Sequence, residues 1–194
     1  MERGLNWLKI KFKSPLPPSV NDYLGKAVRY NPVTRKYYVQ VFETTQAREY
    51  KSLMKKIIQR EMLDKGWEKT GEFEYIICEV VVFLNQKKRD SDNLFKCLLD
   101  GIKEAGAIYD DCMVIPRVED VLIDSENPRL EITLYISDKR GIFKNEEQLE
   151  RFKIGNCYGC KRYKRYGERC SALRTALENK ISSSIDLKEN KCLI

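Results

Sequence analysis

A ten-residue run from Tyr75 to Leu84 is the feature that most constrains how this chain folds. Most of its side chains are β-branched or aromatic, and the run is long enough to form a central β-strand. It leads directly into residues 90–111, where five aspartates are gathered. A buried strand therefore delivers the chain to a concentrated set of carboxylates.

Further strands and helices are expected around this run. Apolar patterning predicts strands at residues 5–12, 114–123 and 130–136, and the turn sequence Asn31-Pro32-Val33-Thr34 predicts a hairpin over residues 27–42. Helical spacing predicts one helix that Thr44 or Thr45 caps and that runs to about residue 64, and another of about 14 residues from Asp92 to a cap at Gly106. The first helix should have a face with basic side chains at Arg48, Lys51, Lys55 and Arg60. This face is expected to be solvated, and contact with a DNA backbone is the alternative. The fold class is α+β, or mixed α/β.

The sequence divides near residue 140, within residues 137–145. Residues 1–140 read as one domain, and residues 141–194 as a basic, cysteine-bearing C-terminal extension. In that extension, Lys and Arg alternate with tyrosines over residues 158–169, which suits contact with phosphates and bases as well as a plain solvated segment.

Seven cysteines fall into two groups. The first group has apolar or helical surroundings and is expected in the core: Cys78, Cys97 and Cys112. The second is confined to the extension and supplies four thiols that could hold a structural Zn²⁺: Cys157, Cys160, Cys170 and Cys192. An iron–sulfur cluster and unligated thiols are the alternatives. The odd total and the lack of a secretory signal favour a reducing cytoplasm over a disulfide framework.

Charge points to a polyanionic partner. The chain has 36 Lys and Arg against 29 Asp and Glu, a net charge of +7, which favours nucleic acid or an anionic membrane surface. No run approaches the roughly 20 apolar residues that span a bilayer, so nucleic acid is preferred. The chain has no histidine, so catalysis would depend on carboxylates, lysine, hydroxyls, thiols or metal-bound water.

The spacing of the acidic residues allows two interpretations. Asp90 and Asp92 would point to the same side of an extended segment, Lys96 follows one helical turn later, and Mg²⁺ prefers such oxygen ligands. Alternatively, Asp92 caps the helix, Asp100 pairs with Lys96, and the doublet Asp110-Asp111 forms a turn. The choice depends on whether the loop after the helix returns to it, which spacing does not decide.

The run Asp90-x-Asp92-Asn93-Leu94-x-Lys96-x-x-x-Asp100, followed by Asp110-Asp111, resembles the signature of the RusA family of Holliday-junction resolvases. The segment Pro17-Pro18-Ser19-Val20-Asn21 is similar to the proline-rich segment of that family. Together these cover about residues 5–137. The resemblance implies a homodimeric endonuclease with a mixed sheet flanked by helices. Such enzymes, many of them carried by prophages, resolve four-way DNA junctions in recombination and repair with Mg²⁺ or Mn²⁺.

The resemblance also implies roles for individual residues. Asp90, Asp92 and Asp111 would be the metal-binding catalytic aspartates, and Lys96 the active-site lysine. Site support would come from Asn93, Asp110 and Asn21, with Asp100 in helix pairing. Paired symmetric cuts would leave 5′-phosphates. The family commonly has a further lysine about ten residues after its second aspartate. In this chain either Arg117 replaces that charge from another position or the contact is absent.

Two other functions remain open from the sequence. The chain could be a non-catalytic, zinc-containing DNA-binding or regulatory protein, or a nuclease that acts on other branched DNA.

Overall fold

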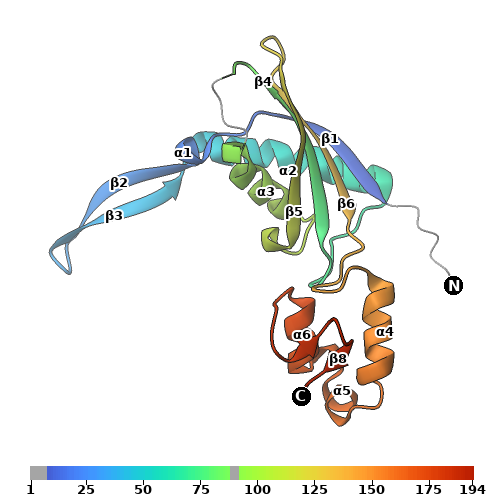
Figure 1. Cartoon of the computed structure of the whole chain (residues 1–194). Coiled ribbons are helices and arrows are strands. Elements are labelled where there is room, and N and C mark those ends of the chain that lie inside the picture. Colours follow the sequence, from blue (N-terminus) through green and yellow to red (C-terminus); the bar gives the residue numbers. More distant parts are fainter. Residues whose placement is uncertain (1–7, 88–91) are drawn as a thin grey trace. The chain divides into compact units, whose positions relative to one another are not determined.

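The computed structural model describes residues 8–87 and 92–194, with the side chain of Asp92 outside the description (Figure 1). The chain forms two compact units. The N-terminal unit comprises Met1–Thr70 and Ile76–Tyr135, and the C-terminal unit comprises Gly71–Tyr75 and Ile136–Ile194.

A four-stranded sheet is the centre of the N-terminal unit. Its strands are β1 (Lys9–Pro15), β4 (Ile76–Leu84), β5 (Val114–Ile123) and β6 (Arg129–Ile136), in the order β1-β6-β4-β5. Strands β1 and β6 are antiparallel whereas β4 and β5 are parallel, so the sheet is mixed. The predicted α+β class and the central position of the 75–84 run are confirmed.

Two helices, α2 (Thr45–Lys65) and α3 (Phe95–Glu104), lie beside the sheet (Figure 1). Ile10 and Phe12 of β1 are buried while their neighbours are exposed, as expected for a sheet with one covered face. The Ser14 and Tyr50 hydroxyls, 2.7 Å apart, join β1 to α2. At Gly101 of α3, a Cβ atom would lie 3.3 Å from Cβ of Met54, so glycine allows the two helices to approach closely.

Helix α2 begins and ends as predicted. The Thr44 hydroxyl accepts a hydrogen bond from the Ala47 amide at 3.3 Å, and Gly66 ends the helix in the left-handed conformation with φ 66°. The solvated face predicted for this helix is wrong at Lys51, which is buried. Its ammonium group bonds Glu43 at 2.6 Å and also pairs with Glu104 of α3.

The predicted second helix starts with a 3₁₀ turn, η1 (Asp92–Leu94), before α3. Gly106 follows the helix at φ 82°, as expected for a C-terminal cap. A second 3₁₀ turn, η2 (Asp111–Met113), leads into β5. Of the first predicted strand, residues 5–7 lie outside the described residues.

The predicted hairpin is present. A short helix α1 (Val20–Tyr23) precedes β2 (Leu24–Asn31), which pairs antiparallel with β3 (Lys36–Glu43). The Asn31 side chain accepts hydrogen bonds from the amides of Val33 and Thr34 at 2.9 and 3.2 Å, and thereby forms the turn. The hairpin forms a sheet separate from the central one.

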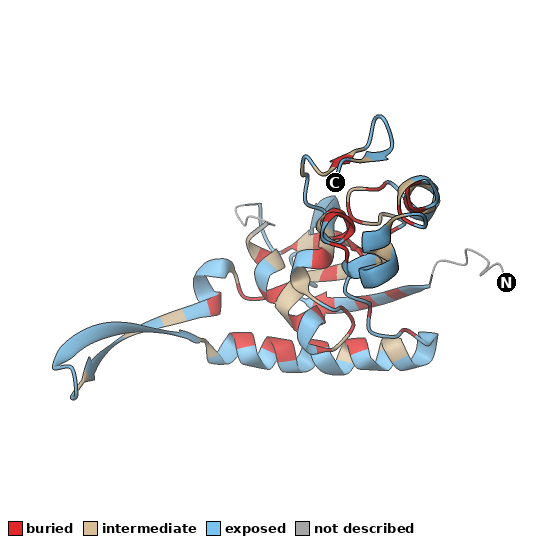
Figure 2. Cartoon of the chain, turned by 90° about the horizontal axis from the view of Figure 1, so that it is seen from below, coloured by how far each residue is buried: buried red, intermediate tan, exposed pale blue. Residues whose placement is uncertain are grey.

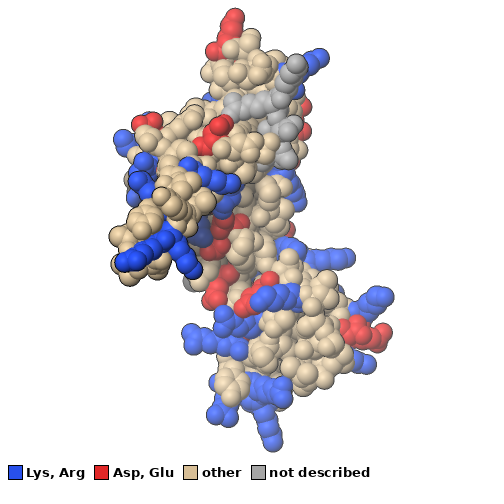
Figure 3. Space-filling model, turned by 90° about the vertical axis from the view of Figure 1, so that its left-hand side faces the viewer, with Lys and Arg blue, Asp and Glu red and all other residues tan. Residues whose placement is uncertain are grey.

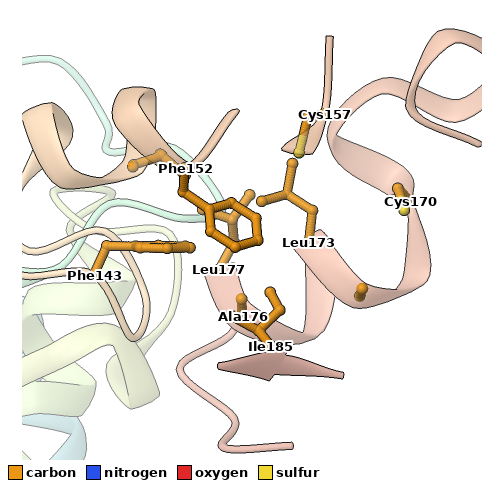
Figure 4. Packing of buried hydrophobic residues seen from close by; sticks show 10 residues of the cluster. Phe143, Phe152, Cys157, Cys170, Leu173, Ala176, Leu177 and Ile185 are labelled. Atoms are coloured by element: carbon orange, nitrogen blue, oxygen red, sulfur yellow. The ribbon is translucent and has the colours of Figure 1, made fainter. Parts of the chain in front are cut away.

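The C-terminal unit is mainly helical. It contains α4 (Glu146–Asn156), α5 (Lys161–Tyr166), η3 (Gly167–Arg169), α6 (Ser171–Leu177) and the two-residue strands β7 (Ile185–Asp186) and β8 (Lys191–Cys192). Its own hydrophobic core includes Phe143, Phe152, Leu173 and Leu177 (Figure 4). The Phe143 and Phe152 ring centroids are 5.2 Å apart.

Two of the three cysteines predicted in the core, Cys78 and Cys97, are buried. The prediction is wrong for Cys112, which is exposed. This residue lies in the 3₁₀ turn η2, where its backbone amide bonds the Asp110 side chain at 3.1 Å and the turn runs along the surface.

Candidate functional site

Two lysines of α3 hold the Asp111 carboxylate between them. Lys96 Nζ lies 3.5 Å from Asp111 Oδ2, and Lys103 Nζ lies 3.1 Å from Asp111 Oδ1. Lys96 and Lys103 are seven residues apart, which places them two turns along the same face of the helix. The Asp111 side chain keeps 29% of its exposure, so it is still open to solvent.

Each lysine has a second carboxylate partner. Lys96 pairs with Asp100 at 3.0 Å, and Lys103 with Asp110 at 2.7 Å. Asp110 also caps η2 by accepting the Cys112 amide. The Lys96–Asp100 pair and the turn at Asp110-Asp111, which formed the purely structural alternative, are therefore both present. In addition, Asp111 returns to α3.

The loop after α3 returns because the N-terminal unit holds it at two points. Trp67 Nε1 donates to the Ala107 carbonyl at 2.9 Å, and the Tyr109 amide donates to the Thr70 hydroxyl at 3.0 Å. Trp67 is 4% exposed, so the first of these contacts is fixed by burial. These contacts bring η2 back beside α3.

A second group of side chains extends the cluster toward the hairpin. The Tyr23 hydroxyl lies 2.5 Å from Asp100 Oδ2 and 2.8 Å from Glu43 Oε1. Together with Lys51 and Lys103, these residues line an open pocket of about 510 Å³. Sequence reasoning missed Tyr23, Glu43 and Lys103. The available signal for Lys103 was its seven-residue spacing from Lys96 on the predicted helix.

The electrostatics of the cluster keep the partners charged. Hydrogen bonding to Asp100 raises the pKa of Lys96, and hydrogen bonds to Asp110 and Asp111 raise the pKa of Lys103. The hydrogen bond from Lys103 holds the pKa of Asp110 well below its usual range. Burial, followed by the hydrogen bonds to Asp100 and Glu43, raises the pKa of Tyr23, so its phenol stays a donor.

The other predicted site residues have mixed positions. Asp90 lies outside the described residues, and of Asp92 only the backbone is described, at the start of η1. Asn93 follows in the same turn and is half-buried. Asn21 is exposed on α1, and from the same short helix it is Tyr23 that reaches Asp100. Arg117 lies on β5, with its guanidinium 3.8 Å from Glu79.

The described part of the cluster contains carboxylate oxygens, the type of ligand that a hard cation prefers. The Asp111 oxygens, which would attract such a cation, are contacted by the ammonium groups of Lys96 and Lys103. Among the described residues, however, no three His, Cys, Asp or Glu side chains are arranged to hold a metal ion. The assignment of Asp90, Asp92 and Asp111 as ligands thus stays a prediction.

The four tail cysteines gather in the C-terminal unit. Cys157, Cys160, Cys170 and Cys192 all line one small pocket, together with Phe152 and Leu173. Cys157 and Cys170 are buried, whereas Cys160 and Cys192 are half-buried. Although the four residues line one pocket, no three of the described cysteine side chains are arranged to hold a metal ion, so zinc binding by these residues stays a prediction.

Among the described helices, none is long and apolar enough to cross a membrane.

A family model described as endodeoxyribonuclease RusA matches residues 15–135, which include the hairpin, helices α2 and α3, strands β4 and β5, and the acidic cluster. The curated proteins give no match.

Proposed function

The chain belongs to the RusA family of endodeoxyribonucleases, and from this premise we propose that it resolves Holliday junctions in DNA recombination and repair. The observation that carries the proposal is the Asp111 carboxylate, which is held between Lys96 in the first turn of α3 and Lys103 in its last turn. Asp90 and Asp92 directly precede that helix in the sequence. The matched region therefore contains the carboxylates and the cations that phosphodiester hydrolysis needs.

Asp90, Asp92 and Asp111 would hold Mg²⁺ or Mn²⁺. A metal ion bound there would polarise the scissile phosphate and promote attack by water. Lys96 would face the phosphate and stabilise the charge that develops in the transition state, because a fixed cation aimed at developing charge favours that state over the ground state. Release of the 3′ oxygen would leave a 5′-phosphate.

Lys103 and Asp100 would position these groups. Lys103 fixes Asp111 from one side, and Asp100 orients Lys96 through their 3.0 Å contact. Two copies related by a two-fold axis would present two such sites, which suits paired, symmetric cuts in the two strands of a junction. We therefore propose a homodimer acting on branched DNA in the cytoplasm.

The test is cleavage of a labelled synthetic four-way junction with Mg²⁺ and with a chelator. Asp90→Asn and Asp111→Asn should each reduce cleavage by at least about a hundredfold, because the removal of one ligand charge weakens the metal site. Junction binding should persist, since the basic surface supplies most of the affinity for the DNA backbone. Asp64→Asn, at an exposed position of α2, is the matched control and should cut normally.

Three results would contradict the proposal. Full activity of Asp111→Asn would remove that carboxylate from the site. A wild-type protein that binds junctions but never cuts them would instead support the non-catalytic DNA-binding alternative. Faster cutting of a fork or flap than of a four-way junction would identify a nuclease for other branched DNA.

For the C-terminal unit we propose a structural Zn²⁺ held by Cys157, Cys160, Cys170 and Cys192. The support is the single pocket that all four residues line. Thiolates are preferred zinc ligands, and a structural zinc site commonly has four of them.

A further inference from the structure

The β2–β3 hairpin, which we call the ribbon (residues 24–43), has no obvious role in the N-terminal core. It projects away from α1 and α2 and stands apart from the four-stranded sheet (Figure 1). Nearly all its residues are exposed or half-buried (Figure 2). Val28 and Tyr37 keep 70% and 75% of their exposure. An extended element with so little burial needs a binding role to account for it.

The two faces of the ribbon differ in chemistry. Directly opposite residues of an antiparallel pair share a face. Val28 faces Val39, and Tyr30 faces Tyr37, with the two tyrosine rings 5.2 Å apart. This face is mainly apolar, although it also carries the pair Lys26–Val41. The other face, which we call the polar face, contains the pairs Gly25–Phe42, Ala27–Gln40, Arg29–Tyr38 and Asn31–Lys36.

Apart from Glu43 at its root, all charged side chains of the ribbon are positive. Between Leu24 and Phe42 the sequence has four basic residues, Lys26, Arg29, Arg35 and Lys36, and no Asp or Glu. Figure 3 shows Lys and Arg side chains gathered on the part of the molecule that projects toward the viewer. Arg29 Nε donates to Gln40 Oε1 at 3.2 Å, which holds the guanidinium on the polar face. This composition complements a polyanion.

Both ends of the ribbon are fixed to the candidate site. Tyr23 immediately precedes β2, and Glu43 is the last residue of β3. The Tyr23 hydroxyl joins Glu43 to Asp100, the partner of Lys96. The Thr44 amide also donates to the Tyr23 carbonyl at 3.1 Å. The root of the ribbon is therefore connected to Lys96 through two contacts, Tyr23 with Asp100 and Asp100 with Lys96.

We propose that the polar face of the ribbon binds a duplex arm of the DNA beside the cleavage site. A two-stranded ribbon fits the major groove, where Arg29, Lys36 and Gln40 can reach phosphates and base edges. Because its root is fixed at Asp100, the ribbon sets the position of that arm relative to Lys96 and Asp111. This inference rests on the proposed nuclease function and specifies how its substrate is held.

The test measures affinity for a labelled four-way junction over a range of salt concentrations. Arg29→Gln with Lys36→Gln should weaken binding at least about tenfold at 0.1 M salt and reduce the salt-dependence slope by about 1.8, because two phosphate contacts are lost. Arg29→Lys, which keeps the charge, should retain most of the affinity. The matched control is Lys55→Gln with Arg60→Gln on α2, which removes the same charge and should change affinity by less than about threefold.

The outcomes separate the ribbon from the proposed function. Equal losses in the control and ribbon variants would overturn the proposal, since net charge alone would explain them. Unchanged affinity of the ribbon variant would also overturn it, whereas cleavage by the wild type would still support the nuclease. If the ribbon variant loses affinity and the wild type cuts no junction, DNA binding by the ribbon is supported and the nuclease function is contradicted. Val28→Thr with Val39→Thr should leave junction affinity unchanged. If this valine variant instead dissociates a dimer, and Arg29→Gln with Lys36→Gln has no effect on affinity, the ribbon is an interface between copies and the proposal is overturned.

Discussion

At the residue scale, Tyr23 connects three parts of the N-terminal unit through one hydroxyl. Its oxygen lies within hydrogen-bond distance of Glu43 at the end of the ribbon and of Asp100 on α3. The side chain is 6% exposed, so solvent cannot easily replace the hydrogen bonds that its hydroxyl makes to these two carboxylates.

Tyr23→Phe should therefore lower the free energy of unfolding by about 1–3 kcal/mol. Chemical denaturation followed by circular dichroism measures the change. Tyr37→Phe, on the exposed ribbon at 75% exposure, is the matched control and should lie within about 0.5 kcal/mol of wild type. Equal stability of Tyr23→Phe and wild type would mean that water replaces the phenol at this position.

Lys51 shows how burial changes the expectation for a single charge. Burial acts to lower its pKa, but the hydrogen bonds to Glu104 and Glu43 outweigh burial and raise it. The residue occupies a helical position next to the apolar stripe, and only the approach of α3 to α2 decides that it is buried.

At the scale of elements, Gly141 determines how the start of the C-terminal unit meets α6. Its φ of 59° is left-handed, and a Cβ atom there would lie 2.0 Å from the carbonyl oxygen of Ala176. The adjacent Ile142 amide donates to that same carbonyl at 2.9 Å. Both the backbone conformation and the close approach require glycine.

Gly141→Ala should destabilise the C-terminal unit by more than about 3 kcal/mol, because the added methyl group meets backbone atoms that have little room to move. Gly66→Ala is the comparison: its φ is 66° but a Cβ atom would meet nothing within 4 Å. That change should cost only about 1–2 kcal/mol for the left-handed conformation. Thermal unfolding monitors both, and similar losses would show that close packing at residue 141 is unimportant.

At the scale of the whole molecule, the chain has two compact units, and the second has its own core around Phe143 and Phe152. A unit of about 60 residues buries a smaller fraction of its surface than a larger domain does, so small domains often depend on a metal or on disulfides. The seven cysteines are free thiols. These facts make zinc a testable source of stability for the C-terminal unit.

Purified protein should therefore contain about one zinc ion per chain, as measured by elemental analysis, and a strong chelator should lower the unfolding temperature of the C-terminal unit. Cys160→Ser should abolish zinc binding. Cys112→Ser, at the exposed cysteine of η2 in the N-terminal unit, should keep the metal. Metal-free protein with the same unfolding temperature as untreated protein would exclude a structural zinc.

Elements whose signals are local could be predicted from the sequence. The cap at Thr44, the turn at Asn31, the Gly106 terminus and the Lys96–Asp100 pair each depend on residues within a few positions of one another. The buried run of β4 and the family signature were equally readable, because one is continuous and the other depends on fixed spacing.

Tertiary structure decided which distant residues meet. The return of Asp111 to α3 depends on Trp67 and Thr70, about 40 positions earlier in the chain, which hold the loop through single hydrogen bonds. Tyr23 reaches Asp100 over a separation of 77 residues. The segment Gly71–Tyr75 belongs to the C-terminal unit, although residues 76–135 of the N-terminal unit separate it in the sequence from the rest of that unit. Such contacts form only when packing positions both partners, and no periodicity or spacing in the sequence encodes them.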